Sequence, residues 1–357
     1  MYTPLIIVAV VSSVVGAIPP QSIFTGPRSN RNSNFFDIQA HRGGRANTIE
    51  NTLPSFAWGL IEGATTLELD NGITKDGVVI IWHDQEVTPS KCRDTAPAFS
   101  DDPDFPYVGK LIANLTWSQI MTLDCSTRQI NFPGQLTYPG TRIPSLSELF
   151  DFLDCADPEH NILLNIESKS NAAFPGRTLD FRTFVHKQYE LFSRSAYYRS
   201  ITELDPTIVT SALIDDYTLM VPEGERVSPW FAGIDINTYN GSNLGERIAE
   251  AAYDIHADIL SPIATSELSP VADPGQPGYS AFTTKAMVSR AHELGLVVKP
   301  WTVNRLNVIE EMVEMGVDGI ITDYPDVLRR WAQQHKLPVA PRYPKYNVLT
   351  CLNRFIS

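Results

Sequence analysis

The stretch "TTLELDNGITKDGVVIIWHD", residues 65–84, decides the fold because it predicts two β-strands around a turn, with ionisable side chains where a buried strand is normally apolar. Successive side chains of a strand point to opposite faces. Glu68 and Asp70 therefore share one face of the first strand, and its leucines share the other. His83 comes at the end of the second strand. We expect the leucines to pack against helices, which leaves the carboxylates on the interior face of a sheet.

The same alternation recurs in two other predicted strands. In "NILLNIESK", residues 161–169, Glu167 and Lys169 share a face, and "DIQAHRG", residues 37–43, delivers His41 at its end. The candidate strands are short apolar or β-branched runs: "FFDIQA", "TTLELD", "VVIIWH", "NILLNIES", "TIVTSAL", "FAGIDI", "ADILSP", "LVVKPW" and "GIITD". Helical patterns separate several of them, at residues 52–62, 145–153, 179–198, 284–294 and 304–315.

Strands that alternate with helices predict a parallel sheet with crossover helices. Eight or so strands over this length favour an α/β fold of the (β/α)8 TIM-barrel type over residues 36–335, rather than an open doubly wound sheet. No G-x-G-x-x-G motif follows the first strand, which argues against a dinucleotide-binding fold. Because the carboxyl ends of barrel strands form the active-site mouth, we expect the ionisable side chains to meet there.

Two segments fall outside this alternation. Residues 88–142 are rich in Pro, Asp and Gly, which predicts an insertion on one barrel loop, with one short helix near residues 116–123. Residues 336–357 are expected to form a C-terminal tail.

Residues 1–17 predict a secretory signal peptide, because an apolar run ends in small residues before a Pro pair. The run is shorter than the roughly 20 residues that span a bilayer, and no later segment is long and apolar enough. We therefore expect a secreted, extracellular protein without a stable membrane anchor. The net charge of -13 and the lack of basic runs argue against a nucleic-acid partner.

The four cysteines fit an oxidising compartment. They show no C-x-x-C pair, so two disulfides are expected, with three possible connectivities. We predict that Cys92 pairs with Cys125, since they flank one loop-rich segment, and that Cys155 pairs with Cys351 by elimination. Buried free thiols are the alternative. Two N-x-S/T sequons make Asn114 and Asn240 candidate glycosylation sites.

The carboxylates at the strand ends predict a metal site. A salt bridge to Lys or Arg would explain any one of them alone. Glu68, Asp70 and Glu167 together repel one another unless a cation lies between them. Oxygen ligands without a nearby cysteine favour one divalent ion, either Mg2+ or Ca2+, over zinc.

Neighbouring polar residues allow two interpretations. Asn51 either caps the helix that starts at Thr52 or, together with Glu50, contacts the metal ligands and holds them in position. Asp323 is expected to shape the last strand-helix turn, because Pro325 follows it, rather than to take part in chemistry.

These residues carry a family resemblance over about residues 38–330. The segments "HRGGRANTIENT", "LELD", "TKDGVVIIWHD", "IESK", "VKPWTVN" and "DGIITDYP" resemble the glycerophosphodiester phosphodiesterase family, in order and at ordinary spacing. The resemblance implies a PLC-like phosphodiesterase barrel with a divalent metal. It also implies hydrolysis of small-molecule glycerophosphodiesters, such as glycerophosphocholine, to sn-glycerol 3-phosphate and an alcohol.

The resemblance also implies roles for single residues. Glu68, Asp70 and Glu167 would bind the metal, His41 and His83 would be the acid/base pair, Arg42 would bind phosphate, and Lys169 and Trp301 would line the site. Two histidines suit this chemistry, because an unperturbed pKa near 6.5 lets them hold opposite protonation states at neutral pH.

Two other functions remain alternatives at this point. One is a phospholipase D-like enzyme on the same barrel that acts on lysophospholipids or sphingolipids. The other is a secreted, non-catalytic binding barrel, which would be expected to have lost a histidine or a metal carboxylate.

Overall fold

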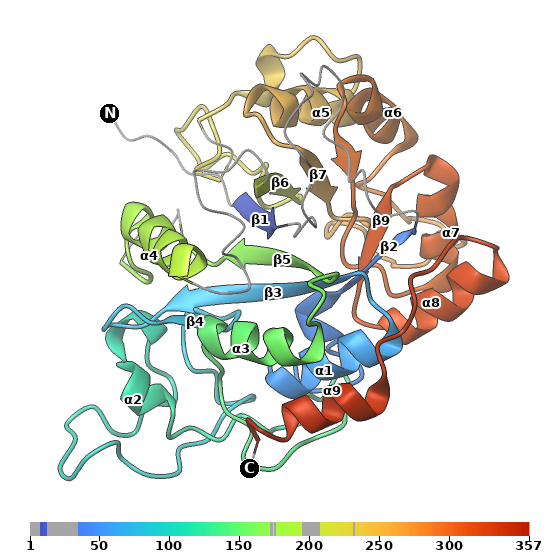
Figure 1. Cartoon of the computed structure of the whole chain (residues 1–357). Coiled ribbons are helices and arrows are strands. Elements are labelled where there is room, and N and C mark those ends of the chain that lie inside the picture. Colours follow the sequence, from blue (N-terminus) through green and yellow to red (C-terminus); the bar gives the residue numbers. More distant parts are fainter. Residues whose placement is uncertain are drawn as a thin grey trace.

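The computed structural model describes residues 8–12, 35–171, 174, 176–194, 208–230 and 233–356. They form an α/β fold in which helices surround a sheet, with α1, α3 and α9 on one side of it and α5 and α6 on the opposite side (Figure 1). The strands are β1 (Val8–Ser12), β2 (Asp37–Ala40), β3 (Thr66–Ile73), β4 (Val79–Ile81), β5 (Leu163–Ser168), β6 (Ile208–Ile214), β7 (Ile259–Pro262), β8 (Val297–Val298) and β9 (Gly319–Thr322). The α-helices are α1 (Leu53–Glu62), α2 (Trp117–Ile120), α3 (Leu146–Ala156), α4 (Phe181–Arg194), α5 (Leu244–Asp254), α6 (Lys285–Glu293), α7 (Leu306–Met315), α8 (Pro325–Gln334) and α9 (Lys345–Leu352).

The sheet is mixed and its strands run in the order β8-β7-β6-β1-β5-β3-β2-β9, with β4 paired to β3 in a hairpin. The pairs β2–β3, β3–β5, β2–β9, β6–β7 and β7–β8 are parallel. Backbone hydrogen bonds also join the two ends of this order: Asp318 N donates to Val298 O at 2.9 Å, and Ile321 N donates to Pro300 O at 3.0 Å. The predicted α/β fold is thus confirmed.

Two predictions about strands need comment. Part of the predicted leader, Val8–Ser12, forms β1, which is antiparallel to both β5 and β6. The rest of residues 1–17 lies outside the described residues. The predicted strand "FAGIDI" is wrong where it is described: its last residue, Ile236, begins a 3-10 helix that Asp235 caps by accepting a hydrogen bond from Asn237 N.

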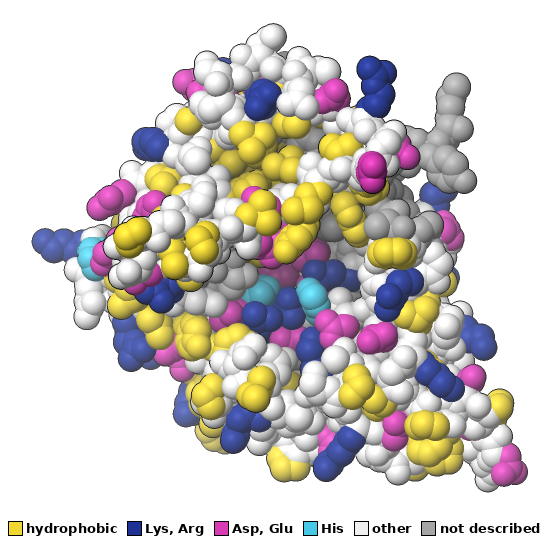
Figure 2. Space-filling view, turned by 180° about the vertical axis from the view of Figure 1, so that it is seen from behind, with side chains coloured by type: hydrophobic (Ala, Val, Ile, Leu, Met, Phe, Trp, Pro, Cys, Tyr) yellow, Lys and Arg dark blue, Asp and Glu magenta, His cyan; other side chains and the backbone are white. Residues whose placement is uncertain are grey.

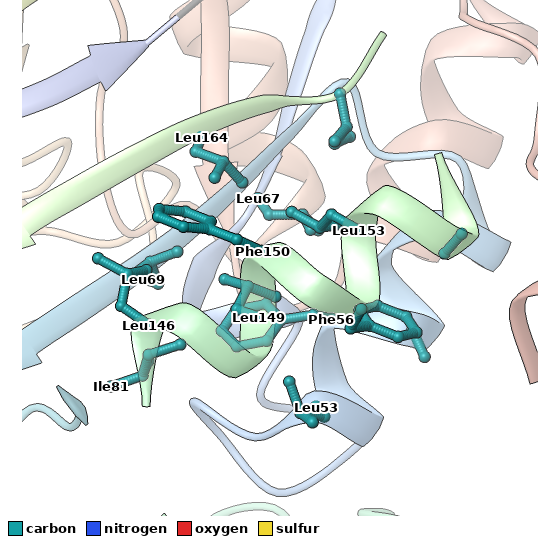
Figure 3. Close-up of a cluster of buried hydrophobic side chains, with 14 of the residues drawn as sticks. Leu53, Phe56, Leu67, Leu69, Ile81, Leu146, Leu149, Phe150, Leu153 and Leu164 are labelled. Carbon is teal, nitrogen blue, oxygen red and sulfur yellow. The ribbon is translucent and has the colours of Figure 1, made fainter. Parts of the chain in front are cut away.

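The main hydrophobic core holds the register of the strands. Leu67 and Leu69 of β3 and Leu164 of β5 are fully buried and lie against α1 and α3, where they meet Phe56 and Phe150 (Figure 3). The leucines therefore face helices, as predicted. Because strand side chains alternate, this contact fixes the opposite face of β3 as the face that carries Glu68 and Asp70.

The insertion, residues 88–142, builds a smaller core of its own beside the β3–β4 hairpin. Tyr107, Ile112 and Ile120 are buried in it together with Trp82, which directly follows β4. Its α-helix is α2, the short helix expected near residues 116–123. The insertion is therefore packed onto the strand ends.

The C-terminal tail folds back onto the main core. Helix α9 packs against α1 and α3, with Val348 and Leu352 buried in their hydrophobic cluster. Disulfides join Cys155 of α3 to Cys351 of α9 and, in the insertion, Cys92 to Cys125. These are the two predicted pairs, and the alternative of free thiols is wrong because none of the four cysteines is free. Among the described helices, none has the length and apolar character needed to cross a membrane.

We expect the Cys155–Cys351 disulfide to contribute more stability than the other one. It joins residues 196 positions apart, against 33 for Cys92–Cys125, and a longer closed loop removes more entropy from the unfolded chain. Replacing both Cys155 and Cys351 by Ala should lower the free energy of unfolding by roughly 4 to 5 kcal/mol, and about 1.5 kcal/mol more than the matched change of Cys92 and Cys125. Denaturant titration measures both. Equal losses, or other pairs in non-reducing peptide maps, would contradict the prediction.

Candidate active site

The site is built on the register of two neighbouring parallel strands. Asp70 of β3 lies opposite Glu167 of β5, and Glu68 lies opposite Asn165. One oxygen from each of Glu68, Asp70 and Glu167 lies within 4.8 Å of the other two. In the described part of the chain, no other group of three His, Cys, Asp or Glu side chains gathers this closely. Figure 2 shows acidic, basic and histidine side chains together at the bottom of a hollow with hydrophobic side chains around it.

The three carboxylates lack full charge compensation. Burial, and then the charges of Asp70 and Glu167, raise the pKa of Glu68 well above its usual range. Burial also acts to raise the pKa of Asp70, but the cations of Lys169 and Arg42 outweigh it and hold that pKa well below its usual range. The Lys169 ammonium lies 2.5 Å from Glu167 Oε1 and 3.1 Å from Asp70 Oδ1. One further cation would therefore allow all three carboxylates to ionise.

The donor set suits a hard divalent ion. All three side chains offer carboxylate oxygens, and buried Asp70 Oδ1 has the ion pair with the Lys169 ammonium but no hydrogen bond of normal geometry. Asn51 holds Asp70 in place, because its Nδ2 donates to Asp70 Oδ2 at 2.8 Å. Asn51 takes a left-handed backbone conformation with φ 56°, and Thr52 rather than Asn51 caps α1. The capping interpretation of Asn51 is therefore wrong, and Asn51 instead supports Asp70, a candidate metal ligand.

Arg42 lies in the short 3-10 helix His41–Gly43 that follows β2. Its backbone N donates to Glu68 Oε2 at 2.7 Å. Its guanidinium donates to Glu50 Oε1 at 3.1 Å and pairs with Asp70 Oδ2 at 3.2 Å. Glu50 thus orients the arginine cation beside the candidate metal carboxylates, and its support of a metal site stays a prediction.

His41 is oriented by a carboxylate that the sequence analysis had assigned only to a turn. His41 Nδ1 lies 2.6 Å from Asp323 Oδ1, while its Nε2 is 3.9 Å from Glu68 Oε2. Asp323 also pairs with Arg45 Nε at 2.8 Å and accepts a hydrogen bond from Asn304 Nδ2 at 2.6 Å. The prediction that Asp323 only shapes the turn is therefore wrong. The missed signal was its place directly after β9, since the other site residues also follow or end strands.

His83 has an equivalent partner. It follows β4, and its Nδ1 lies 2.8 Å from Asp84 Oδ1. Burial and, next, the nearby Lys169 cation lower the pKa of His83 to about 4. Burial likewise lowers the pKa of His41. Both imidazoles are therefore neutral in the structure at neutral pH, and each presents Nδ1 to a carboxylate.

Trp301 lies at the carboxyl end of β8. Its indole Nε1 donates to Ser261 O of β7 at 2.8 Å, and its ring is half-buried. The nearby Lys299 is instead fully buried and pairs with Asp37 at 2.7 Å. A small pocket adjoins Lys169 and Asp84, and Ile73, Phe184 and Arg177 lie in its wall.

Comparison with known proteins identifies the family of this chain. The model of the glycerophosphoryl diester phosphodiesterase family matches residues 41–327, which include every site residue named above except Asp37. A glycerophosphodiester phosphodiesterase from Caldanaerobacter subterraneus subsp. tengcongensis is 25% identical over 298 residues, which cover 82% of this chain and 95% of that protein.

Two solved structures are similar as well. One, from Silicibacter pomeroyi and assigned as a glycerophosphoryl diester phosphodiesterase, has a TM-score of 0.61 and 25% identity, and the match covers 86% of this chain and 96% of that one. The other is a phosphodiesterase from Oleispira antarctica in complex with the product sn-glycerol-3-phosphate, with a TM-score of 0.53, 17% identity and coverage of 84% and 97%. The match of the family model over most of the chain shows that this protein belongs to the glycerophosphoryl diester phosphodiesterase family.

Proposed function

We propose that this enzyme hydrolyses glycerophosphodiesters, such as glycerophosphocholine, to sn-glycerol 3-phosphate and an alcohol, with one divalent ion and a histidine pair. The observation that carries the proposal is the meeting of three carboxylates, two cations and two carboxylate-oriented histidines at one set of strand ends. Family membership supplies the class of reaction. The product bound to the Oleispira relative supports the choice of glycerol phosphate as product.

Glu68, Asp70 and Glu167 would hold the ion, as Mg2+ or Ca2+. When bound, such an ion offsets negative charge on the phosphoryl oxygens. Arg42 and Lys169 compensate part of the charge of the carboxylates, and we expect both to contact the phosphoryl oxygens of a bound substrate.

The histidines would move the protons. Asp323 and Asp84 each engage the Nδ1 of one imidazole, so Nε2 is the nitrogen left for the substrate. We assign His41 as the base and His83 as the acid. Burial keeps both neutral at rest, and the negative charge of an incoming phosphodiester would raise the pKa of His83 and favour its protonation.

We also propose that the sheet is a closed (β/α)8 barrel. The hydrogen bonds that join β8 to β9 support closure at one seam. At the other side, β1 separates β5 from β6, and removal of the predicted leader would bring these two strands next to each other. Both candidate histidines and all three candidate metal carboxylates are present, and no observation favours a phospholipase D-like enzyme or a non-catalytic barrel.

Release of glycerol 3-phosphate from glycerophosphocholine tests the reaction. EDTA should abolish release, and added Mg2+ or Ca2+ should restore it.

His41→Ala and His83→Ala should each lower kcat by about 100- to 10,000-fold, because each removes a proton-transfer group. Glu68→Gln should weaken divalent-ion binding in calorimetry. The control is His292→Ala, which changes an exposed histidine on α6 and should leave kcat unchanged. Full activity of metal-stripped enzyme would refute the metal dependence.

Asp323→Asn should lower kcat by about 10- to 100-fold, because His41 loses its orienting carboxylate.

The same substitution should also change how the free energy of unfolding depends on pH in the acid range. Burial opposes ionisation of Asp323, but His41 and Arg45 outweigh it and lower its pKa to about 2. The ionised group therefore stabilises the fold above pH 4, and about 2 kcal/mol is lost as the pH falls to 2.

Denaturant titrations at pH 2 to 5 measure this effect. The wild type should lose more stability on acidification than Asp323→Asn does. Asp254→Asn, which changes an exposed carboxylate at the end of α5, should behave as wild type. Parallel stability curves for Asp323→Asn and the wild type would contradict the assignment.

Secretion is proposed from the predicted leader, with support from the two disulfides and from the exposure of Asn114 and Asn240. The protein purified from culture medium should begin near Ile18, by N-terminal sequencing, and should carry glycans at one or both asparagines, by mass spectrometry of peptides. A medium without the protein, or an intact Met1 in the purified chain, would refute this proposal.

A further inference from the structure

The insertion contributes one charged side chain to the site. Lys91 directly precedes Cys92, and its ammonium lies 2.7 Å from Glu50 Oε1 and 2.7 Å from Asp84 Oδ2. Its side chain is only 16% exposed, so both contacts form in a largely water-free region. A largely buried charge is tolerated only when it is paired, so this double pairing points to a specific role for Lys91.

Each of those two carboxylates contacts a different residue of the proposed active site. Glu50 Oε1 also accepts a hydrogen bond from Arg42 Nη1 at 3.1 Å. Asp84 Oδ1 lies 2.8 Å from His83 Nδ1. One ammonium therefore connects the carboxylate that orients the phosphate-binding arginine with the carboxylate that orients a catalytic histidine.

Loss of this ammonium would affect the two carboxylates differently. Glu50 would keep two cationic partners, because Arg42 Nη1 donates to its Oε1 and Arg45 Nη1 lies 3.6 Å from its Oε2. Asp84 is 23% exposed and would lose its one cationic partner among the ion pairs described. It could then turn toward water, which would leave His83 without a fixed orientation.

The insertion holds Lys91 in place by several contacts. The backbone N of Lys91 donates to Thr88 O at 3.0 Å, and the ammonium lies 5.3 Å from the ring centroid of buried Trp82. On its other side, the Cys92–Cys125 disulfide and the paired backbones of Arg93 and Asp124 tie the segment to the rest of the insertion. The disulfide therefore restricts how far Lys91 can move.

We propose that Lys91 is a positioning residue for the phosphodiesterase reaction, which fixes Asp84 and Glu50 and through them His83 and Arg42, and that the Cys92–Cys125 disulfide keeps it there. This inference rests on the proposed function. It gives the insertion a part in catalysis, although no residue of the insertion touches the predicted metal ligands in the ion pairs described.

Kinetics of Lys91→Met test the proposal. We expect kcat to fall by about 10- to 100-fold with KM changed less than threefold, because the substrate still meets Arg42 and Lys169 while proton transfer is impaired. Lys91→Arg can still pair with both carboxylates and should keep most of the kcat. The matched control is Lys110→Met, which removes another lysine of the insertion, paired only with Asp104, and should behave as wild type.

The disulfide is tested by replacing both Cys92 and Cys125 with Ala. This variant should lose kcat in the same direction as Lys91→Met. In the Lys91→Met background the cysteine changes should cause no further loss, because both act through one contact. Additive losses would overturn the link between the disulfide and Lys91.

A readout without turnover separates this proposal from the proposed function. In protein with isotope-labelled histidine, assigned with His83→Gln, the ring signals of His83 should shift in Lys91→Met and stay unchanged in Lys110→Met. If the wild type releases no glycerol phosphate, the proposed function fails and these signals still decide the role of Lys91. Wild-type kcat or unchanged His83 signals in folded Lys91→Met would overturn it.

Discussion

The placement of Asp70 opposite Glu167 on neighbouring parallel strands is the constraint on which the site depends. Like charges directly opposite each other destabilise a sheet. The arrangement holds because Leu67, Leu69 and Leu164 bury the other face of the same strands, and a shift of one residue would exchange the two faces. Burial of the leucines thus holds together carboxylates that repel, and this repulsion is the basis of the cation site that we propose.

The site residues whose direction follows from the alternation of side chains along a strand were predictable from the sequence. Glu68, Asp70 and Glu167 lie on strands, where the direction of a side chain follows from its position, and His41 and His83 come directly after strands. Asp323 obeys the same rule, since it follows β9, but the neighbouring Pro325 pointed to a turn. No local sequence pattern shows that His41 and Asp323, which are 282 residues apart, are in contact.

The other residues of the site and the C-terminal helix depend on tertiary contacts that no local sequence pattern reveals. Lys91 and Arg45 reach the site from loops, so neither periodicity nor strand position marks them. The C-terminal tail becomes helical where α9 can bury Val348 against α1 and α3. The predicted strand "FAGIDI" fails in its described part, because the side chain of Asp235 bonds to the backbone there and competes with strand pairing.

The supporting residues form one continuous chain of alternating charge between the two histidines, and Glu50 is its central member. The order is His41, Asp323, Arg45, Glu50, Lys91, Asp84, His83. Desolvated charges are tolerated only while each has its partner, so removal of one member leaves its neighbours uncompensated. A change near one histidine can therefore reach the other without contact with substrate. We therefore expect the two proposed proton-transfer histidines to respond to changes anywhere in this network of ion pairs.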